Sequence, residues 1–152
     1  MNSPESRPAL ILVVEDNIVN QKVVTTLLRR GGYEVVVANH GAEALECLES
    51  REYDLVLMDL QMPVMDGILA TQRIRGCERW AKLPVVALTA NALPEASDRC
   101  RAAGMNGFLT KPINSSLLVK MVSVFTSATR DLAALGEALE VEARRVPAWV
   151  VM

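Results

Sequence analysis

Short apolar runs, separated by helical patterns, constrain the fold of this 152-residue chain more than any other feature. Each run is too short for a helix and lacks polar alternation, which is typical of strands buried on both faces of a parallel sheet. The predicted strands span residues 10–14, 35–38, 55–58, 85–88 and, more weakly, 107–109. The predicted helices span residues 18–30, 42–49, 68–75, 94–103 and 115–125. Strand and helix alternate five times, which predicts a three-layer α/β sandwich with right-handed crossovers.

Local signals set the ends of several predicted helices. Asn17 is a candidate N-cap for helix 18–30, and Gly31 follows its last residue. Pro94 lies in the first turn of helix 94–103, and Gly104 lies just beyond its end. Apolar residues recur at helical spacing in helix 18–30, which predicts a face turned toward the sheet. These residues are Val19, Val23, Val24, Leu27 and Leu28.

Composition and charge exclude several classes of function. The chain is 51% hydrophobic, which indicates a globular protein, and its net charge of -2 argues against the broad basic face of a nucleic-acid binder. No apolar run approaches the length of a membrane span, and the first residues do not resemble a signal peptide. The three cysteines are far apart and the chain has one histidine, so a zinc site or disulfide framework is not expected. We therefore expect a cytoplasmic protein that neither binds nucleic acid directly nor inserts in a membrane.

The alternating pattern indicates one domain with extensions at both ends. We expect a flexible N-terminus over residues 1–8, the domain over 9–127 and a helical extension over 128–152. Within the extension, residues 131–145 carry leucines at helical spacing, namely Leu132, Leu135 and Leu139. This stripe could cover the domain, pair with a second copy of the chain or bind a partner. The sequence leaves these alternatives open.

Polar side chains follow four of the predicted strands, at the point where each strand ends. Glu15 and Asp16 come after the first strand, and Asp59 comes after the third. Thr89 comes after the fourth, and Lys111 follows the fifth. The carboxyl ends of parallel strands form the edge at which open α/β sheets bind ligands. We therefore expect these side chains to share one pocket.

Such a pocket suits phosphoryl chemistry with a divalent cation. The carboxylates of Glu15, Asp16 and Asp59 would repel one another, and Mg²⁺, which prefers oxygen ligands, would relieve that repulsion. An aspartate can act as a nucleophile and form an aspartyl phosphate. Lys111 would offset charge on the transferring group, and Thr89 could hydrogen-bond a phosphate oxygen.

The residues around these positions resemble the response-regulator receiver family of two-component signalling. The resemblance covers roughly residues 9–127 and rests on four ordered motifs. The motifs are ILVVEDN at 11–17, LMDLQMPVMDG at 57–67, ALTAN at 87–91 and GFLTKP at 107–112. It implies a flavodoxin-like fold, with a five-stranded parallel sheet in the order 2-1-3-4-5 flanked by five helices. The C-terminal helix would be an addition to it.

By this resemblance, Asp59 is the phosphoacceptor and also a ligand of Mg²⁺. Asp16 would bind the metal directly, Glu15 would help through a water molecule, and the backbone carbonyl of Gln61 would complete the protein ligands. The acidic pair here is Glu-Asp, whereas Asp-Asp is also common in the family. The acidic pair would still bind the metal, but the side chain of Glu15 is longer than that of an aspartate.

The resemblance also implies a switch and a class of partner. Thr89 would be the switch hydroxyl, Phe108 the switch aromatic and Lys111 the cation that pairs with the phosphate. The sequence EDNIVNQ at 15–21, with MPVMDG at 62–67, resembles receivers attached to hybrid histidine kinases. The expected partners are a histidine kinase or a histidine phosphotransfer protein, and pairing with a second copy of the chain is a further prediction.

The expected function is therefore that of a phosphoacceptor which switches a binding surface or relays the phosphoryl group. It would catalyse only its own phosphorylation and dephosphorylation, so it is not expected to be an enzyme. One alternative is a constitutive scaffold or dimerisation domain. A weaker alternative is a magnesium-dependent phosphatase with an aspartyl intermediate. Such enzymes commonly carry an aspartate as general acid two residues after the nucleophile, but here that position is Gln61, which cannot serve.

Overall fold

A single parallel sheet forms the centre of the computed structural model, which describes residues 8–90, 93–130 and 150–151. Its strand order is β2-β1-β3-β4-β5-β6, so five strands follow the order expected of a flavodoxin-like fold. All strand pairs are parallel. The strands are β1 (Leu10–Val14), β2 (Glu34–Ala38), β3 (Leu55–Asp59), β4 (Val85–Thr89), β5 (Gly107–Thr110) and β6 (Val150–Val151).

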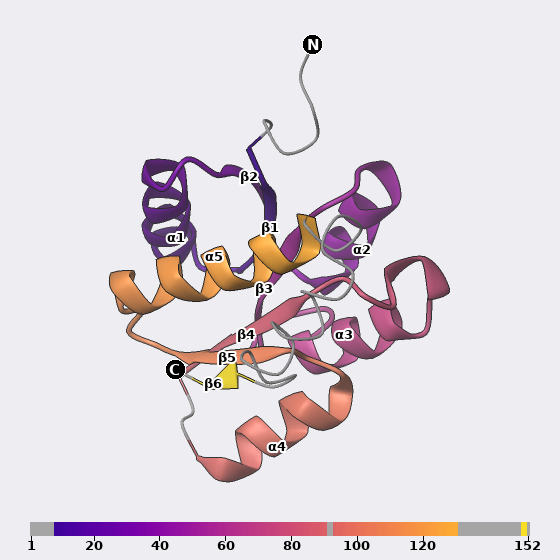
Figure 1. Cartoon of the computed structure of the whole chain (residues 1–152). Helices are drawn as coiled ribbons and strands as arrows, with labels where there is room; N and C mark the ends of the chain where they lie inside the picture. The colour runs from indigo at the N-terminus through magenta and orange to yellow at the C-terminus, as the bar shows by residue number, and fades with distance from the viewer. Residues whose placement is uncertain (1–7, 91–92, 131–149, 152) are drawn as a thin grey trace.

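Helices cover both faces of the sheet and produce the predicted three layers. Figure 1 shows α1 and α5 on one face, and α2, α3 and α4 on the other. The helices are α1 (Ile18–Arg30), α2 (Gly41–Ser50), α3 (Gly67–Arg75), α4 (Pro94–Ala103) and α5 (Ser115–Arg130), with a short 3₁₀ helix, η2 (Glu78–Trp80). None of the described helices is both long and apolar enough to cross a membrane.

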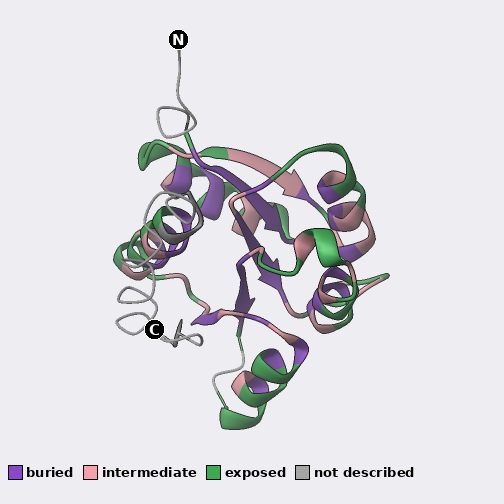
Figure 2. Ribbon diagram, turned by 45° about the vertical axis from the view of Figure 1, so that its right-hand side comes forward, coloured by how far each residue is buried: buried purple, intermediate pink, exposed green. Residues whose placement is uncertain are grey.

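Strands β1, β3 and β4 are buried on both sides, as their unbroken apolar runs predicted, whereas β2 at the edge of the sheet is only partly buried (Figure 2). Alternate residues of β1 enter two separate cores, because successive side chains of a strand point to opposite faces. Leu12 packs with residues of α2, α3 and α4, whereas Ile11 packs with residues of α1 and α5. The two cores fix the strand positions, and therefore the edge at which the polar residues lie.

Side-chain caps begin α1 and α3, the helices that follow β1 and β3. The Asn17 side chain accepts a hydrogen bond from the Asn20 amide at the start of α1, as predicted. Asp66 caps α3 in the same way, through the Leu69 amide. Gly104 ends α4 in a left-handed conformation with φ of 100°, which glycine adopts without the steric cost of a Cβ.

Two predictions about helices need correction. The apolar stripe of α1 does not face the sheet along its whole length: Val24 and Leu28 are buried, but Val19 and Val23 are exposed, as is Ile18. The stripe is wider than the surface that the sheet can cover, because α1 lies at the margin of its layer. In addition, α5 continues to Arg130, past residue 125, where the predicted helix ends.

The C-terminal segment adds a strand that the sequence did not predict. Val150 and Val151 pair in parallel with Gly107 and Phe108 at the outer edge of β5. The helix expected over 131–145, with its leucine stripe, lies outside the described residues. The assignment of residues 128–152 as a helical extension therefore stays a prediction.

Candidate functional site

The sheet places the expected site residues at one edge. Glu15 and Asp16 directly follow β1, while Asp59 and Thr89 are the last residues of β3 and β4. Lys111 directly follows β5. Since all these strands run in the same direction, their carboxyl ends converge, as the strand pattern predicted.

The three carboxylates form a compact cluster. Oxygen atoms of Glu15, Asp16 and Asp59 all lie within 4.8 Å of one another. The cluster is partly sealed from solvent, because Glu15 is 1% exposed and Asp59 is 4% exposed, whereas Asp16 is exposed. Nζ of Lys111 reaches into it, at 2.9 Å from Oε2 of Glu15 and 3.4 Å from Oδ1 of Asp59.

Burial and crowding change the proton affinities of these groups. Burial, and then the neighbouring Glu15 carboxylate, raise the pKa of Asp59 to about 6, against the opposing effects of the Gln61 amide and Lys111. Burial alone would lower the pKa of Lys111, but its hydrogen bond with Glu15 and the charge of Asp59 raise it. Lys111 therefore stays a cation at this edge, while Asp59 holds its proton more tightly than an ordinary aspartate does.

The donor set fits a hard divalent cation. Three carboxylates with one exposed member offer oxygen ligands together with access to water, a combination that suits Mg²⁺. A cation there would reverse the local electrostatics, since it would favour the ionised form of Asp59. Asp16, Asp59 and Glu15 are the residues that would hold it.

The acidic pair is supported by hydrogen bonds that the sequence analysis did not predict. Oε1 of Glu15 accepts a hydrogen bond from the Asn17 amide at 3.2 Å and from the Asn20 side chain at 3.5 Å. The Gln21 side chain donates to the backbone carbonyl of Glu15 at 2.6 Å. The signal available in the sequence was the group of polar side chains in the first turn of the helix that follows the acidic pair.

Gln61 contacts the proposed phosphoacceptor through its backbone. Its amide donates to Oδ1 of Asp59 at 3.2 Å. The same loop follows Asp59 directly, so the Gln61 carbonyl expected to bind the metal lies within two residues of the acid cluster.

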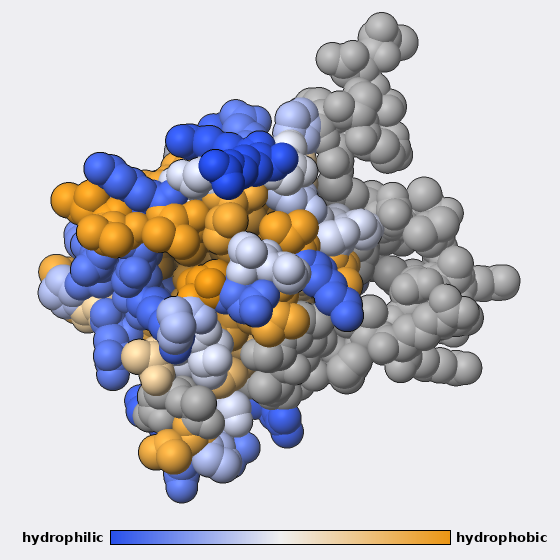
Figure 3. All heavy atoms as spheres, turned by 90° about the vertical axis from the view of Figure 1, so that its left-hand side faces the viewer, coloured by the Kyte–Doolittle hydropathy of each residue, from blue (hydrophilic) through white to orange (hydrophobic). Residues whose placement is uncertain are grey.

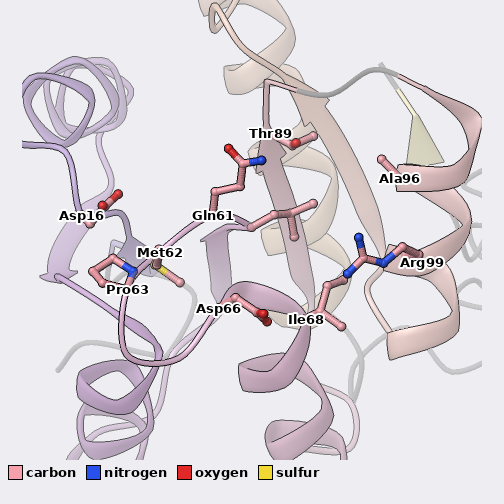
Figure 4. Close-up of a pocket in the computed structure, with 10 residues that line it drawn as sticks. Asp16, Gln61, Met62, Pro63, Asp66, Ile68, Thr89, Ala96 and Arg99 are labelled. Carbon is pink, nitrogen blue, oxygen red and sulfur yellow. The ribbon is translucent and has the colours of Figure 1, made fainter.

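A cavity of about 520 Å³ opens beside the cluster (Figure 4). Asp16 lies at one end of it, and Arg99 of α4 extends toward it from the opposite wall. Thr89 and Gln61 line the space between them. The cavity gives the acid cluster an open approach large enough for a phosphoryl group, and Arg99 is a cationic wall residue that the sequence did not predict.

The two expected switch residues are buried on neighbouring strands. Thr89 and Phe108 are each 2% exposed. Phe108 pairs in register with Ala87 on β4 and belongs to the core shared with α3 and α4. Thr89 lies two residues further along β4, at the cavity, so the register puts the hydroxyl and the aromatic ring on adjacent strands under α4.

Comparison with known proteins identifies the family. Residues 11–123 match the family model described as the response regulator receiver domain. The chain belongs to the response regulator receiver family. The four motifs that carried the resemblance all lie within the matched receiver residues.

The most similar curated proteins include receivers within histidine kinases. The receiver is 44% identical over 124 residues to hybrid signal transduction histidine kinase B of Dictyostelium discoideum, with 74% of this chain and 6% of that protein covered. It is 40% identical over 125 residues to the sensor histidine kinase RcsC of Salmonella typhimurium, with 82% and 13% covered. The chain thus spans a small part of these relatives, and the predicted likeness to receivers of hybrid histidine kinases is confirmed.

Solved receivers have the same fold. A receiver domain of a Pseudomonas aeruginosa sensor histidine kinase, crystallised with magnesium in its active-site cleft, has a TM-score of 0.74 at 41% identity, covering 79% of this chain and 98% of that one. The yeast Ssk1 receiver domain, crystallised with the histidine phosphotransfer protein Ypd1, gives a TM-score of 0.77 at 30% identity, with 82% and 92% covered. These structures confirm the predicted flavodoxin-like sandwich.

Proposed function

We propose that this receiver accepts a phosphoryl group on Asp59 from a phosphohistidine of a kinase or phosphotransfer protein, with Mg²⁺ bound beside it. One observation carries the proposal: the buried Asp59 carboxylate lies between two other acids and the Lys111 ammonium at an open cavity. The proposal includes the cytoplasmic location expected from the sequence.

The transfer requires only a carboxylate and charge compensation. An Asp59 oxygen attacks the phosphorus atom, the new O–P bond forms and the N–P bond of the phosphohistidine breaks. The imidazole nitrogen of the donor keeps the electron pair of that bond. Later attack of water on phosphorus releases inorganic phosphate and regenerates the Asp59 carboxylate. The domain thus has self-phosphorylation and self-dephosphorylation chemistry but no separate substrate.

The surrounding residues lower the barrier by position and charge. Asp16 and Asp59, the Gln61 carbonyl and, through water, Glu15 would hold Mg²⁺, which neutralises developing charge on the phosphoryl oxygens. Lys111 already contacts Asp59 and Glu15 through its ammonium. It is therefore placed to pair with the transferred phosphoryl group, at the position where the family resemblance assigns this role.

The attached phosphoryl group would act as a local charge switch. Thr89 would hydrogen-bond a phosphate oxygen, and Phe108 would follow the movement within the core shared with α4. The position of α4 and β5 would then change, and with it the surface that a partner reads. Such a switch is a charge event that biases a two-state element.

An apolar surface beside the site supports docking of a phosphodonor protein. The α1 patch consists of Ile18, Val19 and Val23, of which Ile18 is 64% and Val19 is 68% exposed. Figure 3 shows apolar side chains gathered on the face that carries α1. A cavity of about 180 Å³ beside Val23 leads to Glu15 and Lys111, so a partner on the patch would reach the acid cluster. The yeast Ssk1 receiver, crystallised with a phosphotransfer protein, supports the proposal of that class of partner for this chain.

The decisive experiment is phosphoryl labelling of the Asp59→Asn variant. With Mg²⁺ and either acetyl phosphate or a radiolabelled phosphohistidine protein, the wild-type chain should incorporate label and the variant should not, because an amide is a poor nucleophile. Asp98→Asn is the control, since Asp98 is an exposed acid on α4 that does not belong to the cluster of three carboxylates. Label that persists in Asp59→Asn at the wild-type level would exclude Asp59 as the acceptor.

Two rival functions give different results in simple assays. A phosphatase should turn over p-nitrophenyl phosphate continuously, whereas a receiver should not, and Gln61 offers no carboxylic acid to protonate a leaving group. A constitutive scaffold should show the same oligomeric state with and without beryllium fluoride, a phosphoryl mimic. Analytical sedimentation measures the oligomeric state in both conditions, and it also tests whether a second copy of the chain pairs with the first.

A further inference from the structure

We infer that Gln21 and Asn39 are positioning residues that brace the acid site, so that the carboxylates of Glu15 and Asp16 stay in place for the cation. This inference rests on the proposed function, because it concerns the proposed metal site. It assigns a role to a hydrogen-bonded chain that runs from the β1–α1 loop through α1 to the β2–α2 loop and α2.

The chain begins at the main chain of the acidic pair. Nε2 of the Gln21 side chain donates to the Glu15 carbonyl at 2.6 Å and to Oδ1 of Asn39 at 2.8 Å. On its other side, the Glu15 amide donates to the Ala38 carbonyl at 3.0 Å. Both main-chain polar groups of Glu15 are thus engaged, and the residue that directly precedes Asp16 is held from two directions.

The next links run into the loop between β2 and α2. The Asn39 side chain donates to the carboxylate of Glu43, at 3.1 Å and 3.3 Å from its two oxygens. Because the Glu43 carboxylate can only accept, it fixes the Asn39 amide with its oxygen toward Gln21. The donors and acceptors agree along the whole chain, which favours one geometry over a set of alternatives.

The same loop also contacts the loop that carries Gln61. The Gly41 amide donates to the Met65 carbonyl at 3.3 Å. A Cβ on Gly41 would lie 2.8 Å from that carbonyl oxygen, so the two loops approach closely only because this residue is glycine. The segment from Asn39 to Gly41 therefore contacts α1 next to Glu15 on one side and the loop after β3 on the other, and so helps to set the separation of the residues that would bind the metal.

This arrangement has a consequence for cation binding. Three carboxylates within 4.8 Å repel one another before a cation arrives, so the loops tend to separate unless other contacts hold them. Outer residues that orient ligands in this way commonly change metal affinity by about 10- to 100-fold when they are altered. The brace lies on the β1–α1 side, and its loss should weaken Mg²⁺ binding without removing any ligand.

The test compares Mg²⁺ binding by Gln21→Met and by Thr26→Val in the full chain, using isothermal titration calorimetry. Methionine keeps the length of the side chain and removes both hydrogen bonds, whereas Thr26 is an exposed residue of the same helix. We expect the dissociation constant of Gln21→Met to rise roughly tenfold and that of Thr26→Val to stay at the wild-type value. Equal Mg²⁺ dissociation constants for the two variants would overturn the inference that Gln21 positions the acid site.

A second variant separates positioning from general stability. Asn39→Ala changes an exposed side chain, so the fold should survive, and it should weaken Mg²⁺ binding in the same direction as Gln21→Met. In the double variant the two effects should be less than additive, because both act through one chain. Additive effects, or lower melting temperatures with unchanged Mg²⁺ affinity, would reduce these residues to structural ones. A wild-type chain that binds no Mg²⁺ would overturn the proposed metal site itself.

Discussion

The two loops that meet at the acid cluster are held in different ways. The β1–α1 loop is held by side chains from the start of α1, because Asn20 and Gln21 both donate hydrogen bonds to Glu15. The β3–α3 loop is held by hydrogen bonds of its main chain. There the Gly67 amide donates to the Leu60 carbonyl, and the Met65 amide donates back to the Pro63 carbonyl at 2.7 Å, which closes a tight turn around one residue.

The residue inside that tight turn is strained. Val64 has φ of 69°, a left-handed conformation that a β-branched side chain rarely adopts, and its side chain is 80% exposed. Nothing in its burial compensates for the strain. The comparison teaches that the β1–α1 loop is adjustable through its side chains, whereas the β3–α3 loop depends on its backbone path, so substitutions in the two loops should fail for different reasons.

The largest effect is expected for Gly67→Ala, which tests the backbone path directly. A Cβ at Gly67 would lie within 3.0 Å of the Leu60 main chain and even closer to the Asp59 carbonyl oxygen, and neither can move without displacing β3. We expect a loss of roughly 3 kcal/mol or more in the free energy of unfolding, measured by urea denaturation. Gly76→Ala is the control at the other end of α3, where the nearest atoms would be 3.5 Å away. Similar losses in both variants would show that the path after Asp59 is not special.

The next largest effect concerns the charge that both loops enclose. The pKa of Asp59 is raised to about 6 from the usual 3.8, so the folded state binds the proton more tightly than the unfolded state does. Wild-type stability in EDTA should therefore fall as the pH rises from about 4 to about 6, by at most about 3 kcal/mol. Asp59→Asn removes this loss and should be the more stable protein at pH 7.5, but not at pH 4.

Chemical denaturation at several pH values measures this difference. Mg²⁺ should narrow it at pH 7.5, because the cation binds the folded wild-type protein better than the variant. Asp98→Asn serves as the matched control, since Asp98 is an exposed acid. A gap between wild type and Asp59→Asn that does not depend on pH would contradict the crowding of charge at the site.

The smallest effect is expected for Val64→Gly, which removes the strained side chain. The left-handed conformation costs a non-glycine residue roughly 1–2 kcal/mol, and the greater freedom of glycine in the unfolded chain offsets part of that gain. The net result should be a stabilisation of up to about 1 kcal/mol, read as a rise in melting temperature. Val19→Gly, at another exposed valine but inside α1, should instead destabilise by a few tenths of a kcal/mol. A loss of stability in Val64→Gly would show that Val64 makes a useful contact.

Much of the fold was predictable because its signals are local. Apolar runs of strand length, such as Leu10–Val14, and caps such as Asn17 act within a few residues, and the structure reproduces β1, α1 and α4 with the predicted bounds. The prediction failed where a surface had to be shared between elements. Apolar spacing alone did not show that the margin of α1, with Val19, would be left outside the core.

The acid site was predictable in its members but not in its contacts. Strand ends marked Glu15, Asp16 and Asp59, because the carboxyl edge of a parallel sheet gathers them. The Gln21–Asn39 contact and the Arg99 wall of the cavity join elements whose separation depends on helix packing. No short-range pattern in the sequence encodes that separation.

The sequence by itself determined the order of strands and helices, the chemistry at the strand ends and the family. These depend on periodicity and on ordered motifs, which are properties of neighbouring residues. Only the tertiary structure decided that Asp59 is buried against Glu15 and Lys111, that its pKa is raised, and that the segment from Asn39 to Gly41 contacts both α1 and the loop after β3. The physical reason is that burial, electrostatic coupling and loop spacing depend on distances between segments far apart in the chain.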